Sequence, residues 1–293
     1  MLRFALVTLP PVALLLLALL RGGPWPGLAL AWMTVLTALA DRLLPEPPAE
    51  GSPARGTALS VTLGLLQAPL FLAGVAALSG RLGPVQAPGA SPVQAVVLFL
   101  ALALFLGQVG NANAHELIHR PARWMRRLGA VCYGVVLFGH HASAHLRVHH
   151  VHAATPDDPN SARRGESFWR FAGRAWIGSF RAGWRAERRL GRRGLRHPYV
   201  AYAGLAVLSL GLSCIIGGIA GLGWALALAA YVQLQLLLSD YVQHYGLSRA
   251  TLPSGRPAPM APAHSWNAPH AVSAALMLNA PRHSDHHATP SRP

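Results

Sequence analysis

The sequence predicts an all-α, polytopic integral membrane protein with about six transmembrane helices. Hydrophobic residues make up 52% of the chain and its mean hydropathy is +0.33. Charged residues make up only 12%, whereas soluble domains carry about 25%. The apolar residues gather into runs that approach or exceed the roughly 20 residues a helix needs to cross a bilayer. We therefore expect a single membrane domain over residues 1–293.

The apolar runs predict the positions of the membrane spans along the chain. The first four predicted spans cover residues 4–20, 24–40, 58–79 and 92–112. A shorter run at 128–139 is predicted to lie at the membrane interface or to re-enter it. Residues 198–238 are apolar apart from a Gly-Leu-Gly interruption at 221–223, which predicts a hairpin of two further spans.

The distribution of arginine predicts the orientation, because cytoplasmic loops carry an excess of positive charge. All 25 basic residues are arginines. With the N-terminus inside, Arg3, Arg42, Arg55 and the region 120–197 are cytosolic, whereas Arg21 and Arg81 are external. The chain is thus expected in a bacterial-type inner membrane, with its site at the cytosolic face. This placement explains the net charge of +15 without a nucleic-acid partner.

The segment 163–196 alternates arginine with aromatic residues. The aromatic residues recur at multiples of four: Phe168, Trp176, Phe180 and Trp184. This pattern is typical of an amphipathic helix in the lipid headgroup layer. It favours a lipid-anchoring surface over a dock for an acidic redox partner.

Fifteen histidines are present, and none precedes residue 115. The first cluster, HELIH, places His115 and His119 at i and i+4, where both imidazoles face one side of a helix and can grip one metal ion. The same pattern occurs in zinc proteases, in which Glu116 would be the general base.

The second cluster, HLRVHHVH, again has an i, i+4 pair, His145 and His149. His150 follows directly and would point about 100° away on a helix, so the cluster can serve two metals or approach one metal from two sides. His140 and His141, just upstream, are as readily interfacial residues as ligands.

The third cluster, RHSDHH, contains His283, His286 and His287. Asp285 is a candidate to accept the second ring proton of a ligand histidine and so fix its tautomer. His244, just after the last predicted span, lies at the same membrane face as the clusters. Nine imidazoles exceed what one metal can bind, which indicates two metals and favours iron and O₂ chemistry.

These motifs resemble the membrane di-iron hydroxylase and desaturase superfamily, and more closely the alkane 1-monooxygenase family. HELIH, HLRVHH followed by ATPDDPNSARRGES, QHYGLSR and RHSDHHATP are similar to its signatures, and so is LADRLLPEPP after the second span. The resemblance runs from about residue 25 to the end of the chain.

The resemblance implies a set of nine iron ligands. They are His115, His119, His145, His149, His150, His244, His283, His286 and His287. It also implies two non-haem iron ions, O₂ as co-substrate and insertion of oxygen into a terminal C–H bond of a hydrophobic substrate that enters from the membrane lipid. Electrons would come from reduced rubredoxin and an NAD(P)H-dependent rubredoxin reductase. Glu116 and Asp285 are the catalytic candidates beside the ligands.

The chain departs from the family pattern at three places. Ala144 stands where the family commonly has Glu, and Asp240-Tyr-x-Gln243 replaces Asn-Tyr-x-Glu. These changes are expected to retune the irons or the substrate preference. The chain also lacks the tail expected after the third cluster, so we expect a C-terminal truncation.

Three alternatives remain open at this stage. A fatty-acyl desaturase would use the same irons to remove two hydrogens. An intramembrane zinc protease would use HELIH, although the sequence has no LDG-like motif to supply a third ligand. A metal transporter would place its site near the bilayer midplane, not at one face.

Overall fold

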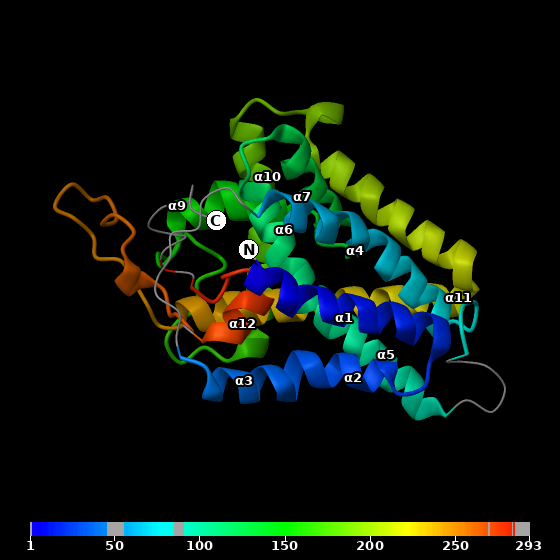
Figure 1. Ribbon diagram of the computed structural model, residues 1–293. Coiled ribbons are helices and arrows are strands. Elements are labelled where there is room, and N and C mark those ends of the chain that lie inside the picture. The colour runs from blue at the N-terminus through cyan, green and yellow to red at the C-terminus, as the bar shows by residue number, and fades with distance from the viewer. Residues whose placement is uncertain (1, 46–55, 85–90, 269, 283, 285–293) are drawn as a thin grey trace.

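The computed structural model describes residues 2–45, 56–84, 91–268, 270–282 and 284. Over these residues the protein is all-α, and the only β-type pairing is an isolated antiparallel bridge between Thr251 and Pro257. Among the described residues, four helices are long and apolar enough to cross a membrane: Leu2–Arg21, Thr57–Leu78, Pro92–His119 and Pro198–His244. The long helices run together as an elongated bundle (Figure 1). The protein is therefore a helical membrane protein, as predicted.

The region of the second predicted span folds as three consecutive helical segments, which are not among the four described helices long enough to cross a membrane. Helix α1 (Leu2–Arg21) is followed by α2 (Trp25–Ala31), the π-helical turn η1 (Trp32–Leu36) and α3 (Thr37–Leu43). The indole Nε1 of Trp32 donates to the carbonyl of Val7 at 3.1 Å, which ties this run to α1. Helix α4 (Thr57–Leu78) then packs beside the first cluster.

One uninterrupted helical run carries the first histidine cluster. It consists of α5 (Pro92–Phe105), the π-helical turn η2 (Leu106–Gly110) and α6 (Asn111–His119). The side chain of Asn111 donates to the carbonyl of Val232 at 3.0 Å, and that of Asn113 donates to the carbonyl of Ser60 at 2.9 Å. Polar bonds between helices stabilise packing inside a bilayer. These two bonds fix the end of the run against its neighbours.

The long C-terminal helix α11 (Pro198–His244) breaks at Gly218. Its φ of 62° and ψ of −147° lie in a region that is essentially restricted to glycine. The two halves meet there as a V (Figure 1). The predicted interruption is therefore present, but it lies three residues before the Gly-Leu-Gly at 221–223. The count of six spans and their orientation remain predictions.

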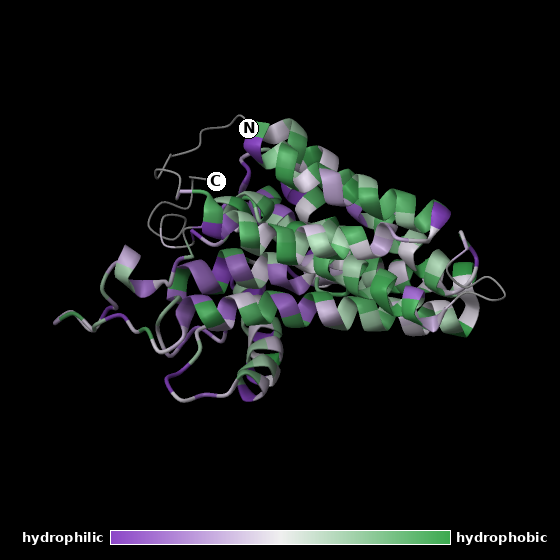
Figure 2. Ribbon diagram, turned by 60° about the horizontal axis from the view of Figure 1, so that its bottom comes forward, coloured by the Kyte–Doolittle hydropathy of each residue, from purple (hydrophilic) through white to green (hydrophobic). Residues whose placement is uncertain are grey.

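The remaining helices follow or connect these elements. They are α7 (Arg123–Val135), α8 (His140–Ala144), η3 (His145–His149), α9 (His150–His152), α10 (Phe168–Arg189), η4 (Gly194–Arg196), η5 (Pro262–His264) and α12 (Ala271–Leu276). Helix α7 begins five residues before the predicted 128–139 run and ends four before its end. Hydrophilic residues gather at the end of the bundle that holds the C-terminal segment (Figure 2).

Helix α10 is amphipathic, as predicted. It buries Phe171 and Ala175 against the bundle and exposes Trp169 and Trp184 together with several arginines. The carboxylate of Glu166, just before the helix, pairs with Arg174 at 2.7 Å. This ion pair fixes the start of α10 next to the loop that follows the second histidine cluster.

Asp41, at the end of the second predicted span, connects to the C-terminal segment. One carboxylate oxygen accepts from the backbone N–H groups of Val272 at 2.6 Å and Ser273 at 3.1 Å. Backbone N–H groups in the first turn of a helix have no acceptor within the helix, and here the carboxylate of Asp41 accepts from two of them. The short helix before the third cluster is thus held against α3.

Candidate metal centre

The first two site residues project from the last turns of α6. His115 and His119 are one helical turn apart, with ring centroids 4.8 Å apart. Helix α7 packs close beneath them at Gly129, where a Cβ would lie 2.8 Å from the carbonyl oxygen of Ala114. A residue larger than glycine at that position would push the histidine-bearing helix away.

The second histidine cluster folds as the π-helical turn η3. A π-helix closes hydrogen bonds between residues five apart, and the N–H of His150 bonds the carbonyl of His145 in this way. The Nε2 atoms of these two residues lie 2.9 Å apart. His145 thus also pairs with His150, five residues further on, while its ring centroid lies 5.1 Å from that of His149.

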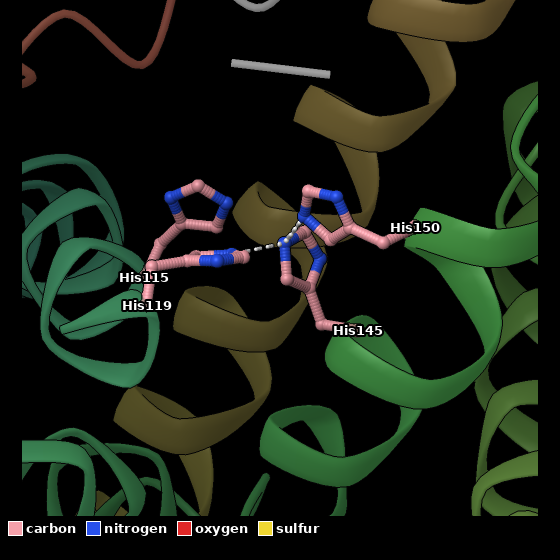
Figure 3. Close-up of side chains that lie close together, drawn as sticks. All are labelled: His115, His119, His145 and His150. Carbon is pink, nitrogen blue, oxygen red and sulfur yellow. Dashed lines mark hydrogen bonds between the residues drawn. The ribbon is translucent and has the colours of Figure 1, made fainter. Parts of the chain in front are cut away.

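Four imidazoles from the two clusters converge on one point (Figure 3). His115, His119, His145 and His150 each offer a ring nitrogen, and these nitrogens all lie within 4.8 Å of one another. The Nε2 atoms of His119 and His145 are 3.1 Å apart. Because metal–imidazole bonds are about 2.0–2.1 Å long, two ligand nitrogens of one ion are separated by at most about 4.2 Å. The four-histidine cluster is close to this geometry.

His149 faces a different partner. Its ring lies 4.9 Å from that of His244, at the end of α11. Its Nδ1 is 2.9 Å from a carboxylate oxygen of Asp158, while the Nδ1 of His244 is 3.1 Å from the carbonyl oxygen of His264. Because both oxygens accept, each Nδ1 carries a proton, and in the neutral ring Nε2 is then the nitrogen that could bind a metal. The adjacent histidines 149 and 150 therefore serve two separate groups.

Burial and charge set the protonation of the second cluster. Burial, followed by the neighbouring imidazoles, holds the pKa of His145 well below its usual value, so the ring is neutral. Burial also acts to lower the pKa of His149, but the Asp158 carboxylate outweighs it and raises that pKa. Asp158 is itself buried, and the same pairing lowers its pKa in spite of that burial. Burial thus keeps the ring of His145 neutral, whereas the Asp158 carboxylate orients the ring of His149.

The third cluster lies almost wholly outside the described residues. His283, His286, His287 and Asp285 are not described, so their predicted roles stay predictions. Ser284 is described and buried, and it bonds the amide of Asn267 twice. Asn267 in turn lines the cavity beside His115 and His145.

Two upstream histidines have other surroundings. His140 is buried between Trp176 and Phe180, and its Nε2 lies 3.4 Å from the hydroxyl of Ser179. His141 is buried against the rings of Tyr133 and Phe138. Neither residue belongs to the four-histidine cluster. Glu116 is also buried, and its carboxylate pairs with Arg120 one turn further along the chain.

A cavity of about 330 Å³ opens beside the four-histidine cluster. His115, His141 and His145 form one part of its wall, and η2 and the second half of α11 form another. Asp240 and Gln243, both departures from the family pattern, also line it. The volume is that of a small-molecule pocket, and the histidines lie where they can meet its contents.

Sequence reasoning missed several residues that shape this site. Asp158, Asn267 and the cavity residues Gln108 and Gln235 were not singled out. Asp158 had a usable signal, because an acidic residue that closely follows a histidine cluster is a natural partner for a ring N–H. Nothing in the local sequence marks the other three.

The site's segments fall within a known family model. A model of the fatty acid desaturase family matches residues 91–293. An alkane 1-monooxygenase of Alcanivorax borkumensis is 36% identical over 203 residues, which are 66% of this chain and 50% of that protein. An alkane 1-monooxygenase of Pseudomonas putida is 36% identical over 206 residues, again 66% of this chain and 50% of that protein.

A more distant relative is the hydroxylase component of a xylene/toluene monooxygenase of Pseudomonas putida. It is 28% identical over 206 residues, which are 67% of this chain and 53% of that protein. The chain spans about half the length of the curated relatives it matches. The resemblance that the histidine motifs indicated is confirmed.

Proposed function

The chain belongs to the fatty acid desaturase family, and we propose that it is a membrane non-haem di-iron monooxygenase. It inserts one oxygen atom from O₂ into a terminal C–H bond of an alkane or similar hydrophobic hydrocarbon, in lipid or alkane metabolism. One observation carries this proposal: imidazoles from separate segments converge at the wall of a cavity enclosed by apolar helices. The relatives whose printed names are alkane 1-monooxygenase support the choice of reaction.

We assign the nine histidines to two irons. The four-histidine cluster holds one iron, and its closely spaced Nε2 atoms fit a shared ion. His149 and His244, whose tautomers are fixed by Asp158 and the carbonyl of His264, hold the other. The third cluster, His283, His286 and His287, completes the set, with Asp285 accepting a ring proton. Bound iron would supply the activation of O₂ that an all-protein site lacks.

The chain's own residues prepare the site for this chemistry. The mostly apolar wall of the cavity suits a hydrophobic chain that enters from the lipid. The neutral ring of His145 offers a lone pair, whereas Asp158 holds the ring of His149 in one orientation. Glu116, paired with Arg120, holds the last turn of α6 in place.

The site needs an external source of electrons. We propose reduced rubredoxin, supplied by an NAD(P)H-dependent rubredoxin reductase, and a location in the inner membrane with the site at the cytosolic face. The arginine-rich, aromatic face of α10 supports a position in the headgroup layer of that membrane.

Reconstitution tests the function directly. Purified protein in lipid, with rubredoxin, its reductase, NAD(P)H and oxygen-18 gas, is expected to convert alkanes to primary alcohols that carry the heavy isotope. An alkene formed without isotope uptake would instead identify a fatty-acyl desaturase. A protein that contains one zinc and no iron would contradict both reactions.

Two substitutions test the third cluster. His283→Ala or His286→Ala is expected to remove iron at one centre and abolish hydroxylation, because each would delete a ligand. Iron content and product formation are measured on the same preparation. A variant with full activity would show that the ligand assignment is wrong.

A further inference from the structure

Amide side chains inside the long helices usually have a structural partner in this protein. Four of them donate to a backbone carbonyl of another segment at 2.9–3.1 Å: Gln67 to Cys132, Asn111 to Val232, Asn113 to Ser60 and Gln233 to Val136. These bonds hold helices together where water is absent. The side-chain oxygens of Gln67 and Asn113 have no hydrogen-bond partner among the described residues, but neither residue lines the cavity. Two other amides combine such an oxygen with a place on the cavity wall.

Gln108 and Gln235, the glutamine pair, both line the cavity. Their side-chain oxygens are buried and have no hydrogen-bond partner within the described part of the chain. The oxygen of Gln235 occupies the space above Gly107, where a Cβ would lie only 2.1 Å from it. Glycine at 107, which also lines the cavity, is therefore required for Gln235 to reach this position.

Three other amides and one carboxylate on the same wall have hydrogen-bond partners within the protein. Asn111, Gln243 and Asn267 donate to Val232, Ala280 and Ser284. Asp240 accepts from the side chain of Asn160 at 2.6 Å. Among the buried side-chain oxygens of the described residues that line the cavity, only those of the glutamine pair lack a hydrogen-bond partner, which makes them the acceptors for a ligand that brings a donor.

The glutamine pair lies at a distance from the metal ligands. Gln108 precedes His115 by seven residues on one continuous helical run, which separates their backbones by about 10 Å. A buried amide oxygen without a partner costs free energy that a ligand hydroxyl would recover. A purely apolar substrate would leave these oxygens unpaired.

We propose that the preferred substrate is a hydrocarbon chain with a hydroxyl group at the end remote from the histidines, and that the glutamine pair accepts its hydrogen bond. This inference rests on the proposed function, because the opposite end of the chain must reach the irons. One terminal C–H bond is broken and one C–O bond is formed, so a primary alcohol becomes a diol. The second oxygen atom of O₂ leaves as water, with two electrons from the electron-donor protein and two protons from solvent.

The test compares n-octane with 1-octanol on the iron-loaded protein in lipid. The wild type is expected to favour the alcohol about tenfold in kcat/KM, the effect of one additional buried hydrogen bond. Gln108→Leu and Gln235→Leu together should bring that ratio close to one. Gln108→Asn, which shortens the side chain but keeps the amide, covers the case in which the double variant does not fold.

Equilibrium dialysis of the two ligands provides a readout that does not depend on turnover. Gln67→Leu is the matched control, because it removes an amide of the long helices that is bonded outside the cavity, and it should leave the preference unchanged. Equal binding and turnover of both ligands by the wild type, or a preference that survives in the glutamine variants, would overturn the inference. Binding of 1-octanol that depends on the glutamine pair, without oxidation, would uphold the hydroxyl-binding site but refute the proposed function and with it the role of 1-octanol as a substrate.

Discussion

The adjacent histidines His149 and His150 contact different partners. His150 joins His145 across a π-helical turn, and His149 turns to Asp158 and His244. Because the π-turn adds one residue to the hydrogen-bonded ring, His150 joins the four-histidine cluster while His149 faces His244. π-turns within helices often occur at functional sites, and here the turn contains the ligands themselves.

At the residue scale, His150→Ala is expected to lower bound iron from about two to about one per chain and to abolish hydroxylation, because it deletes one of four converging ligands. Metal analysis and product assays check this. His152→Ala, two residues further on and outside the cluster, serves as the control. Equal iron content in the two variants would contradict the assignment of His150.

A second residue-scale prediction concerns Asp158. Asp158→Asn keeps the shape of the side chain but removes the charge that fixes the ring of His149. We expect iron affinity to fall by about 10- to 100-fold, as is typical when the partner of a ligand histidine is lost. Competition with a chelator measures the change. Asp157→Asn, at the exposed neighbouring position, should bind iron like the wild type.

At the element scale, the break in α11 depends on one glycine. Gly218→Ala places a Cβ on a backbone that only glycine readily adopts, so we expect a loss of roughly 1–3 kcal/mol in stability. Denaturant unfolding in detergent micelles provides the measurement. Gly223→Ala lies in the same helix with open space around it and should not destabilise the protein. Similar losses in both variants would contradict the role assigned to Gly218.

The proposed metal site would join elements from several parts of the molecule. Its candidate ligands lie on α6, η3, α9 and the end of α11. Removal of iron by a chelator should therefore lower the unfolding temperature, since the metal binds only the folded arrangement. Calorimetry before and after chelation measures the shift, and an already metal-poor His145→Ala variant should respond weakly. An unchanged transition in the wild type would argue against a metal that bridges these elements.

Composition and histidine spacing predicted much of this molecule. The apolar runs, the amphipathic α10 and the pairing of His115 with His119 on one face of a helix all follow from patterns visible along the chain. The register of the second cluster does not, because a π-turn is selected by tertiary contacts and has no strong signal in residue type. The glutamine pair could not be found either, since its interest depends on partners that only the folded chain reveals.

The contact of Asp41 with α12 has a consequence for biosynthesis. Asp41 is separated by 231 positions from Val272, whose N–H it accepts, so the ribosome completes every long helix before this bond can form. Helix α12 therefore docks on α3 only after the segments that carry the first two histidine clusters have been synthesised.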